Sequence, residues 1–519
     1  MFKNFVSPML VIALASVALS QQLSHEHSRC LSGCERGDTS VTITQTATST
    51  KELAADTFTN PIIWEDLADL DVFRVGDVWY YTASTMHYSP GAPILRSYDL
   101  VNWEFISHAV PSLSWSSSYD LAGKSRAYVK GIWASTMRYR KSDGKWYWIG
   151  CIEFSKTYIY TASSVTGPWS LAATLNTCLY DCGLLIDDDS TMYVAYGNSK
   201  ITVAQLSSDG TSIVKSQLVY TSPGNIGTLE GSRMYKKDGQ YYIFVTRPAS
   251  QEYVLKASSP FGSYSIKILA NAISAPVSGG GNPHQGGLVD TPDGKWYYAA
   301  FVDAYPGGRI PVLAPVTWGS DGFPVLTTSN GAWGKTYPMP AVAHPLGSMT
   351  GTDSFSGTAL GAAWEWNHNP DTTKFAVNNS LTLSTATITA DLYQARNTLT
   401  HRIHGPTSTA TIVIDTTNMA AGDRAGLSLF RDQSAWIGVI NNGGAFSVAM
   451  VTGIININPG AGRTGSFSYS LDGSTYTSLG SSLTLNNDWR FFMGYRWGIF
   501  NYATTNLGGS VSITSFTED

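Results

Sequence analysis

The sequence is short of charge. Only 14% of its 519 residues are charged, against roughly 25% in an average soluble domain. Low charge can indicate a membrane protein, but no internal apolar run approaches the roughly 20 residues that a membrane span needs. The chain also lacks basic excess, since its net charge is −5 and its pI is about 6.0. Nucleic acid is therefore not an expected partner.

The sequence also lacks helical character. A long-helix protein would be rich in Ala, Glu, Lys, Leu and Arg, and this chain is not. Aromatic residues are abundant instead, with 16 Trp and 28 Tyr, beside 49 Gly. So many large side chains can bury a sizeable core, which excludes a disordered chain. Length and composition together predict an all-β globular protein of two or three domains.

Cysteine is scarce, because the chain has five, too few for a disulfide scaffold and odd in number. Cys30 and Cys34 have the same spacing as Cys178 and Cys182, and each pair is expected to form a disulfide in an oxidising compartment. Cys151 is then left as a buried thiol. The alternative is zinc, although two isolated Cys-x3-Cys pairs lack the second half of a structural site.

The N-terminus has the pattern of a secretory signal. Lys3 precedes a mostly apolar stretch, Val6–Leu19, and Ala18-Leu19-Ser20 forms a small-x-small cleavage site. A membrane anchor is the alternative, but the stretch is too short and has no stop-transfer flank. We therefore expect residues 1–20 to be a signal peptide of a secreted protein with no membrane attachment. Residues 21–56 are expected to be a Ser/Thr-rich spacer.

A turn followed by an aromatic strand recurs five times, at intervals of roughly 50 residues. Such a repeat predicts a five-bladed β-propeller over residues 57–345, because each blade buries its faces against its neighbours. Ordinary hairpins of an unrelated β-fold are the alternative. The copies are Gly76–Tyr81, Asp143–Trp148, Asp188–Tyr193, Asp238–Ile243 and Asp293–Tyr298.

The last third of the chain has a different pattern. Short strand-like runs such as Ala410–Ile414 alternate with turn pairs such as Asp472-Gly473. This pattern predicts a β-sandwich over residues 346–519. The sandwich could bind polysaccharide or brace the propeller.

Three acidic residues precede the first, third and fourth aromatic hairpins: Asp69, Asp181 and Glu230. Asp69 belongs to a run with four acids in seven positions, Glu65 to Asp71. Their common placement would aim all three at the propeller axis, where loops converge on a pocket. Two carboxyl groups flanking a bond can hydrolyse a glycoside. The alternatives are a solvated loop for Asp69, a turn residue for Asp181 and a surface acid for Glu230.

Ordered motifs over nearly the whole chain resemble glycoside hydrolase family 43 and the concanavalin-like β-sandwich often attached to it. The propeller motifs are Asn60-Pro61, Ala68–Asp77, Ser84–Ser97, Asp99–Trp103, Gly131–Ala134, Glu230-Gly231, His284–Val289, Gly307–Arg309 and Pro315–Trp318. The sandwich motifs are Trp364–Pro370, Ala395–Thr400 and Gly422–Leu427.

The resemblance implies a role for each acid. Asp69 would be the general base that activates water, and Glu230 the general acid. Asp181 would orient that acid and tune its pKa. Inversion then requires roughly 6.5 to 9.5 Å between the carboxyl groups of Asp69 and Glu230.

The resemblance also implies ligand-binding residues. Arg309 matches an arginine that donates to sugar hydroxyls, a task suited to its fork of donors. His284 matches an axial histidine that touches a calcium ion or a water cluster, or else it is a hydrogen-bonded core residue. No cofactor is expected for the chemistry itself. Trp133, His87 and Tyr180 are candidate platforms for the sugar, with blade packing as the alternative for Trp133.

We therefore expect an inverting exo-glycosidase that removes terminal α-L-arabinofuranose from arabinoxylan. The alternatives are a β-xylosidase acting on xylo-oligosaccharides and a non-catalytic carbohydrate-binding protein. The expected partner is the polysaccharide, and the protein is expected to be a monomer.

Overall fold

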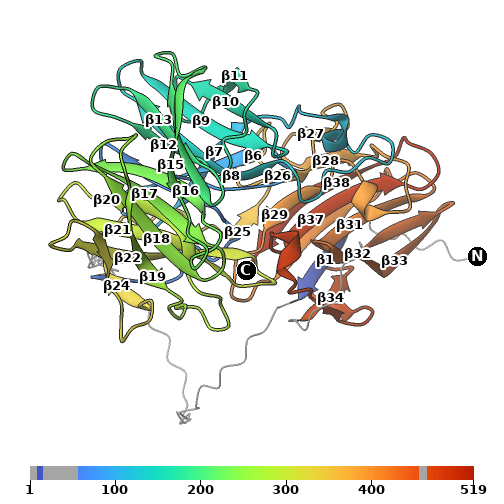
Figure 1. The fold of residues 1–519 in the computed structure, drawn as a ribbon. Helices are drawn as coiled ribbons and strands as arrows, with labels where there is room; N and C mark the ends of the chain where they lie inside the picture. Colours follow the sequence, from blue (N-terminus) through green and yellow to red (C-terminus); the bar gives the residue numbers. More distant parts are fainter. Residues whose placement is uncertain (1–8, 16–55, 455–463) are drawn as a thin grey trace, which may run out of the picture.

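The computed structural model describes residues 9–15, 56–454 and 464–519, which form two lobes (Figure 1). Within these ranges all regular structure is β-strand, apart from three short 3-10 helices. The predicted all-β fold class is therefore confirmed. No helix of the described ranges has the length and apolarity that a membrane crossing would need. The 3-10 helices are η1 (Ser117–Asp120), η2 (Leu392–Gln394) and η3 (Trp489–Phe491).

The first lobe, which we call the propeller domain, contains five four-stranded antiparallel sheets in chain order. Sheet 1 is β3 (Asp71–Val75), β4 (Val78–Thr82), β6 (Gly91–Ser97) and β7 (Glu104–Val110). Sheet 2 is β8 (Ile132–Arg140), β9 (Lys145–Ile152), β10 (Lys156–Ala162) and β11 (Ser170–Leu175). Sheet 3 is β12 (Gly183–Ile186), β13 (Met192–Tyr196), β14 (Lys200–Leu206) and β15 (Ile213–Thr221). Sheet 4 is β16 (Glu230–Lys237), β17 (Gln240–Arg247), β18 (Gln251–Ala257) and β19 (Ser265–Asn271). Sheet 5 is β20 (His284–Asp290), β21 (Trp296–Asp303), β22 (Arg309–Trp318) and β23 (Pro324–Leu326).

The first strands of these sheets lie next to one another around a common centre. β3 contacts β8, β8 contacts β12, β12 contacts β16, β16 contacts β20, and β20 contacts β3 again. The sheets therefore close a ring. The two-stranded pair of β2 (Thr57–Thr59) and β24 (Thr336–Pro338) ties the beginning of the domain to its end.

Each aromatic hairpin found in the sequence connects the first and second strands of one sheet. The residue at the centre of each turn has a positive φ, between 63° and 83°, which glycine adopts without steric cost. This requirement explains why four of the five turns carry Gly. The five residues are Gly76, Gly144, Ser190, Gly239 and Gly294.

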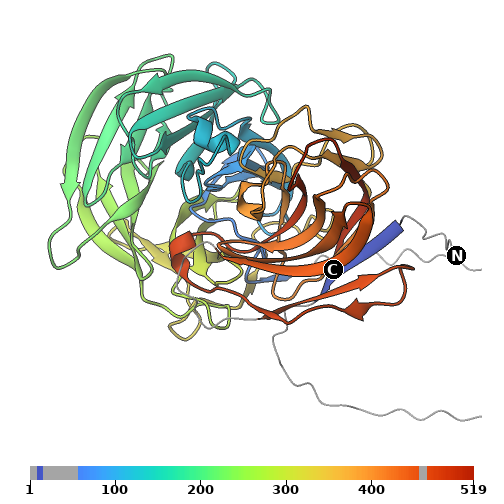
Figure 2. The ribbon, with the colours of Figure 1, turned by 90° about the vertical axis from the view of Figure 1, so that its right-hand side faces the viewer.

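The second lobe, the sandwich domain, has two large sheets, and Figure 2 shows it from a second direction. One sheet runs β33 (Ala445–Ile454), β32 (Gln433–Asn442), β31 (Asp423–Phe430), β37 (Arg496–Ala503), β29 (Leu399–Arg402), β26 (Glu365–Asn367) and β5 (Tyr88–Ser89). The other runs β27 (Phe375–Val377), β28 (Leu381–Ser384), β38 (Ser510–Glu518), β30 (Ala410–Asp415), β1 (Met9–Ala15), β34 (Thr464–Ser470) and β35 (Thr477–Ser478). β25 (Gly351–Asp353) pairs with β38, and β36 (Leu483–Thr484) pairs with β34.

Two strands of these sheets come from distant parts of the chain. β5 follows sheet 1 strand β4 in sequence, yet it pairs with β26, so a propeller segment extends a sandwich sheet. β1 lies between β30 and β34 in the full chain and overlaps the expected signal peptide. Removal of that peptide stays a prediction, and the expected spacer up to residue 55 lies outside the described residues.

The disulfide prediction for Cys178 and Cys182 is wrong. Cys178 is bonded to Cys151, and Cys182 is the buried thiol. The reason is the path of the chain from sheet 2 to sheet 3. Thr157 is the register partner of Cys151 in the neighbouring strand. Its hydroxyl accepts a hydrogen bond from Leu179 N at 2.8 Å and donates one to the Thr177 carbonyl, so it holds the backbone on both sides of Cys178 beside Cys151. Cys30 and Cys34 lie outside the described residues.

We expect Cys151→Ser to lower the free energy of unfolding by about 3 kcal/mol, because the bridge closes a loop spanning 27 residues of sequence. Guanidinium unfolding followed by fluorescence measures this change. Cys182→Ser is the matched control, because it also replaces a buried sulfur but keeps the disulfide. Reduction by dithiothreitol should therefore destabilise Cys182→Ser as much as it destabilises the parent protein. Equal stability of Cys151→Ser and the parent would contradict the assigned pairing.

Candidate active site

The charged residues singled out from the sequence lie at the beginnings of strands, and for all but Arg309 that strand is the first of its sheet. Asp69 precedes β3 by two residues, and Asp181 precedes β12 by two. Glu230, His284 and Arg309 are the first residues of β16, β20 and β22. Because β3, β12, β16 and β20 are first strands of the same ring, their beginnings gather four of these side chains at one end of it. Arg309 reaches the same end because the beginning of β22 pairs with the end of β21.

Asp69 is held by an arginine from the last sheet. The residue is 4% exposed, and its Oδ1 accepts a hydrogen bond from Arg309 Nη1 at 2.9 Å. The guanidinium of Arg309 also lies over the ring of Phe301, 5.2 Å from its centroid. Asp69 itself has a φ of 54°, an uncommon value for a residue with a Cβ atom. Such backbone strain is frequent at functional sites.

Glu230 lies in a different environment. Its Oε2 accepts hydrogen bonds from the Tyr180 hydroxyl at 3.1 Å and from Asn198 Nδ2 at 2.7 Å. Burial, helped by the negative charge of Asp69, raises the pKa of Glu230 above its ordinary value, although the two hydrogen bonds act in the opposite direction. Glu230 therefore keeps its proton to a higher pH than a solvated glutamate, as a general acid requires.

Asp181 is linked directly to the segment of Glu230. Its Oδ2 accepts a hydrogen bond from the Gly231 backbone N–H at 3.1 Å. Burial raises the pKa of Asp181 well above its ordinary value, and the charges of Glu230 and Asp69 raise it further. The three carboxyl groups therefore form one electrostatically coupled set.

We expect Tyr180→Phe to move the alkaline limb of the kcat/KM profile to higher pH. The Tyr180 hydroxyl stabilises the ionised form of Glu230, so its removal raises the pKa of that carboxyl. A pH–rate profile on an aryl glycoside measures the shift. Asn198→Ala removes the other donor and should move the limb in the same direction. A shift to lower pH in both variants would contradict this assignment of the acid.

The other acids around Asp69 are buried and have structural partners. Asp66 accepts from the Arg309 backbone N–H at 2.7 Å and from the Gly494 N–H of the sandwich domain at 2.9 Å. Glu65 Oε1 lies 3.3 Å from a histidine nitrogen of the same domain. Asp71 accepts three hydrogen bonds from β8 in sheet 2. The dense acidic run thus joins Asp69 to the next sheet and to the sandwich domain.

The three predicted sugar platforms have different positions. Tyr180 contacts Glu230, and Trp133 is the second residue of β8, half-buried beside Phe154 with ring centroids 5.6 Å apart. His87 does not fit the prediction, because it has no exposed surface. Its ring stacks on Tyr88 and lies within the contact between the two domains, so it presents no face to a substrate.

His284 is buried at the beginning of β20. Its Nδ1 lies 2.8 Å from the Asn282 carbonyl oxygen, and its ring packs on Phe301. Calcium takes six to eight oxygen ligands. Among the described residues, no group of three or more His, Cys, Asp or Glu side chains is placed to hold a metal. The axial calcium ion or water cluster at His284 therefore stays a prediction, and no step of the reaction is routed through it.

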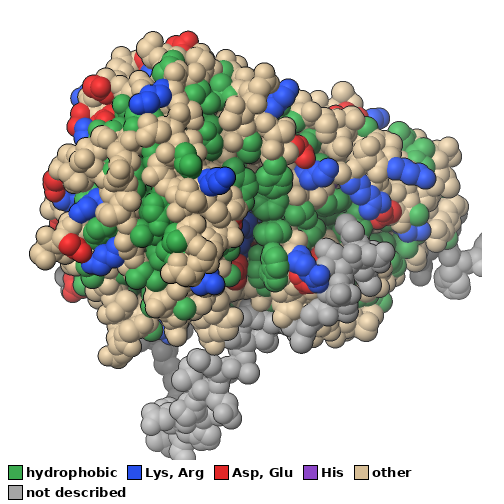
Figure 3. Space-filling view, viewed as in Figure 1, with side chains coloured by type: hydrophobic (Ala, Val, Ile, Leu, Met, Phe, Trp, Pro, Cys, Tyr) green, Lys and Arg blue, Asp and Glu red, His purple; other side chains and the backbone are tan. Residues whose placement is uncertain are grey.

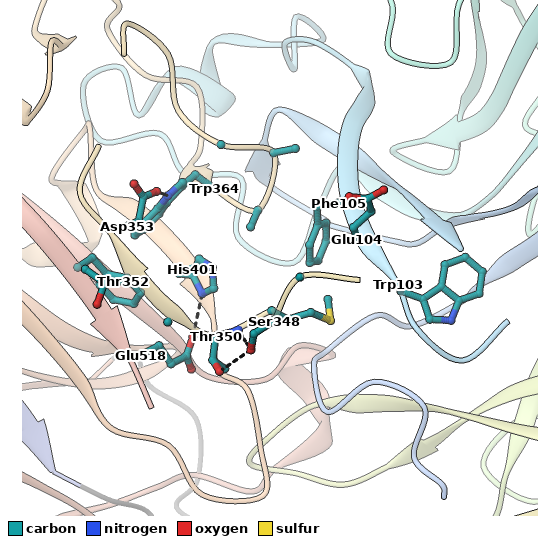
Figure 4. A pocket seen from close by; sticks show the side chains of 17 residues that line it. Trp103, Glu104, Phe105, Ser348, Thr350, Thr352, Asp353, Trp364, His401 and Glu518 are labelled. Carbon is teal, nitrogen blue, oxygen red and sulfur yellow. Dashed lines mark hydrogen bonds and ion pairs between the residues drawn. The ribbon is translucent and has the colours of Figure 1, made fainter. Parts of the chain in front are cut away.

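A cavity of about 350 Å³ lies between sheet 1 and the sandwich domain (Figure 4). Its lining includes none of the three carboxylates. His401 and Glu518 form an ion pair there at 3.1 Å, and Asp353 accepts from Trp364 Nε1 at 2.8 Å. These four side chains are already paired in two separate contacts, so the cavity is a poor alternative to the site at the ring centre.

Sequence reasoning missed several residues of the site. Asn198 lies in a polar loop, and no pattern distinguishes it from other loop residues. Arg233, three residues after Glu230, is fully buried in the middle of a strand. A charged residue among buried strand neighbours is a usable signal, because such a group needs partners. Phe492 of the sandwich domain lies near Arg309 and contacts Trp133, and no local pattern predicts this approach.

The chain is similar to known families and proteins. The profile of glycosyl hydrolases family 43 matches residues 58–324, and that of the beta xylosidase C-terminal concanavalin A-like domain matches residues 352–453. A beta-xylosidase of Formosa agariphila is 28% identical, covering 89% of this chain and 90% of its own. A non-reducing end alpha-L-arabinofuranosidase of Bacteroides ovatus is 30% identical over 61% of this chain and 62% of its own.

A solved structure is closer in sequence than either of these two relatives. It is a GH43 glycoside hydrolase engineered to display both endo-xylanase and exo-arabinofuranosidase activity. It is 47% identical, covers 90% of this chain and 99% of its own, and has a TM-score of 0.85. With the family profile matching half of its length, this chain belongs to glycosyl hydrolases family 43.

Proposed function

We propose that the protein is a secreted, inverting exo-glycosidase that hydrolyses terminal α-L-arabinofuranosyl residues of arabinoxylan. One observation carries the proposal. Two carboxyl groups of the same site have contrasting environments. Asp69 accepts a hydrogen bond from the guanidinium of Arg309, whereas burial raises the pKa of Glu230. Paired carboxyls with contrasting environments are the usual basis of acid and base roles in glycoside hydrolysis.

In the proposed reaction, Asp69 accepts a proton from a water molecule that attacks the anomeric carbon. Glu230 gives its proton to the glycosidic oxygen as the bond to the leaving sugar breaks. Asp181 orients the acid through the Gly231 backbone. Arg309 holds the carboxylate of Asp69 in place by a hydrogen bond, and its remaining N–H groups can donate to hydroxyl groups of the sugar.

The choice of arabinoxylan has two supports. The related structure with 47% identity displays exo-arabinofuranosidase and endo-xylanase activity. The segments Ser84–Trp103 and Trp364–Pro370 resemble those of arabinofuranosidases of this family. The second candidate is a β-xylosidase, because the relative from Formosa agariphila carries that name.

A row of aromatic rings supports a polymeric substrate. It begins at Tyr180, beside the acid, and continues through Phe154, Trp133 and Phe492 to Trp489, with successive centroids 5.0 to 5.9 Å apart. Phe154 and Trp489 are each 59% exposed. Hydrophobic side chains also gather along the boundary between the lobes (Figure 3). Aromatic faces of this kind suit the C–H faces of a sugar chain.

We expect Trp489→Ala to raise KM on arabinoxylan about tenfold and to leave KM on an aryl arabinofuranoside within twofold. The polymer extends beyond the pocket and would lose one apolar contact, worth about 1–2 kcal/mol, whereas the small substrate would not reach it. Steady-state kinetics on both substrates measure the difference. Leu507→Ala, another exposed apolar residue of the sandwich domain, is the control. An unchanged KM on the polymer would contradict the proposed row.

Product analysis tests the proposed specificity. Chromatography of an arabinoxylan digest should show free arabinose and no xylose, and xylobiose should stay intact. Release of xylose from xylobiose would favour the β-xylosidase. Binding of arabinoxylan without any product would favour the non-catalytic carbohydrate-binding protein.

We propose that the chain is exported through removal of residues 1–20, since its substrate is a polymer outside the cell. N-terminal sequencing of the purified extracellular protein should begin at Gln21. Intracellular protein beginning at Met1, with none outside the cell, would contradict export.

A further inference from the structure

Arg233 is a buried cation that the proposed reaction does not use. It lies on β16, three residues after Glu230, and has no exposed surface. Within the described residues, its hydrogen bonds all go to backbone carbonyl oxygens. Nη2 donates to Asp69 O at 2.7 Å and Nε to Leu70 O at 3.1 Å. Nη1 donates to Cys182 O at 2.8 Å and Ser232 O at 2.9 Å.

These carbonyls belong to the segments that carry the three carboxyl groups. Asp69 supplies one itself, Cys182 follows Asp181 directly, and Ser232 lies two residues after Glu230. One guanidinium therefore joins the beginnings of β3, β12 and β16. No other type of side chain offers five donors in a rigid planar fork.

The backbone at Asp69 and Asp181 is in an unfavourable conformation that needs stabilising contacts. Asp69 and Asp181 have φ values of 54° and 48°, in the left-handed region that residues with a Cβ atom disfavour. Such conformations persist only where the surroundings fix them. Arg233 supplies hydrogen bonds at the Asp69 carbonyl itself and at the carbonyl next to Asp181.

The charge of Arg233 is balanced nearby. Asp71 Oδ1 lies 3.9 Å from its Nε, and the other oxygen of Asp71 accepts from Arg138 Nη1 at 2.6 Å. Arg138 thus shares the same carboxylate, but within the described residues its other hydrogen bond goes to the Met137 carbonyl, outside the Asp69, Asp181 and Glu230 segments. The two arginines form a matched pair for an experiment.

We propose that Arg233 is a positioning residue, whose guanidinium sets the mutual spacing of Asp69, Asp181 and Glu230 by holding the backbone beside each of them. This inference rests on the glycosidase function proposed above. It acts through the carboxyl groups and makes no contact with the sugar.

The test compares Arg233→Met, Arg233→Lys and Arg138→Met with the parent on p-nitrophenyl α-L-arabinofuranoside. We expect Arg233→Met to lower kcat at least about 100-fold with KM within threefold, because misplaced catalytic groups slow the chemical step. Arg233→Lys keeps the charge but not the fork, so it should recover only part of the loss. Arg138→Met should keep kcat within threefold.

A second readout separates positioning from stability. Rates are measured on a series of aryl arabinofuranosides whose leaving groups differ in pKa. If Glu230 is misplaced, the Arg233 variants depend more steeply on the leaving group than the parent does, because less proton donation reaches the bond. A smaller fraction of folded enzyme lowers the rate on every substrate by the same factor, so the dependence of the rate on leaving-group pKa stays unchanged. Arg233→Lys carries this readout if Arg233→Met does not fold.

Two results would overturn the inference: kcat within threefold of the parent in folded Arg233→Met, or a parental leaving-group dependence in the Arg233 variants. The activity of the parent protein tests the proposed function. The ratio of kcat in the Arg233 variants to kcat in the parent tests the role of Arg233. A parent active only on p-nitrophenyl β-D-xyloside would change the proposed substrate, and the same comparison would then use that glycoside. A parent inactive on both would overturn both proposals.

Discussion

Asp69→Asn and Glu230→Gln are each expected to lower kcat on arabinoxylan by about 10²- to 10⁴-fold, the range that general acid and base groups supply. Asparagine cannot accept the proton of the attacking water, and glutamine cannot donate one to the leaving oxygen. Both substitutions keep the size of the side chain, so Arg309, Tyr180 and Asn198 keep a partner.

The two variants should differ in their response to the substrate. A leaving group that departs without a proton needs little help from Glu230, so Glu230→Gln should recover much of its rate on an activated aryl arabinofuranoside. Asp69→Asn should stay slow on both substrates, because water still has to be activated.

Asp290→Asn is the matched control, because Asp290 ends β20, at the opposite end of an inner strand, and is paired with Arg74. Its kcat should stay within threefold of the parent. Parental activity of Asp69→Asn or Glu230→Gln on arabinoxylan would refute the assignment of the site.

Glu365→Gln is expected to lower the free energy of unfolding by about 3–5 kcal/mol, the cost of leaving buried charges without their partner. Glu365 has no exposed surface and accepts from Arg402 Nη2 at 2.9 Å and Arg496 Nη1 at 2.6 Å. Its Oε1 also lies 3.0 Å from His108 Nε2 of sheet 1. The variant therefore leaves two guanidinium groups uncompensated at the contact between the domains.

The effect of Glu365→Gln also depends on pH. Burial would raise the pKa of Glu365, but Arg402 and Arg496 outweigh it and hold that pKa well below the ordinary 4.5. A depressed carboxyl pKa stabilises the fold above the ordinary value, and the contribution is lost as pH falls toward the folded-state pKa. The difference between parent and variant should thus be full at neutral pH, begin to shrink as pH falls below 4.5, and disappear only in strong acid.

Urea unfolding at several pH values measures this difference. Glu104→Gln is the control, because Glu104 pairs with Arg96 on the surface of sheet 1, where both side chains are about one-third exposed. Such a pair contributes about 0–1 kcal/mol. A loss in Glu365→Gln no larger than in Glu104→Gln would contradict the account of the domain contact.

The predictable parts of the fold are those fixed by local chemistry. The aromatic hairpins could be found because each turn needs a positive φ, which places Gly at four of the five turn centres. Asp69, Asp181 and Glu230 could be found because they precede those hairpins and match family motifs. Patterns of this kind depend on residues close together in the sequence, so they can be interpreted without knowing which distant segments come into contact.

The errors all depend on distant contacts. The pairing of Cys151 with Cys178 follows from the path between two sheets, which cysteine spacing does not contain. His87 lies beside the predicted motifs in sequence, but the sandwich domain covers it. The roles of Asp66 and Arg233 likewise come from partners far away in the chain.

Proton NMR of the first sugar released from arabinoxylan tests whether Asp69 and Glu230 act as base and acid on opposite sides of the bond. Hydrolysis by a base and an acid on opposite sides of the bond inverts the anomeric centre. We therefore expect β-L-arabinofuranose as the first anomer, followed by mutarotation. α-L-Arabinofuranose as the first product would contradict the roles given to Asp69 and Glu230.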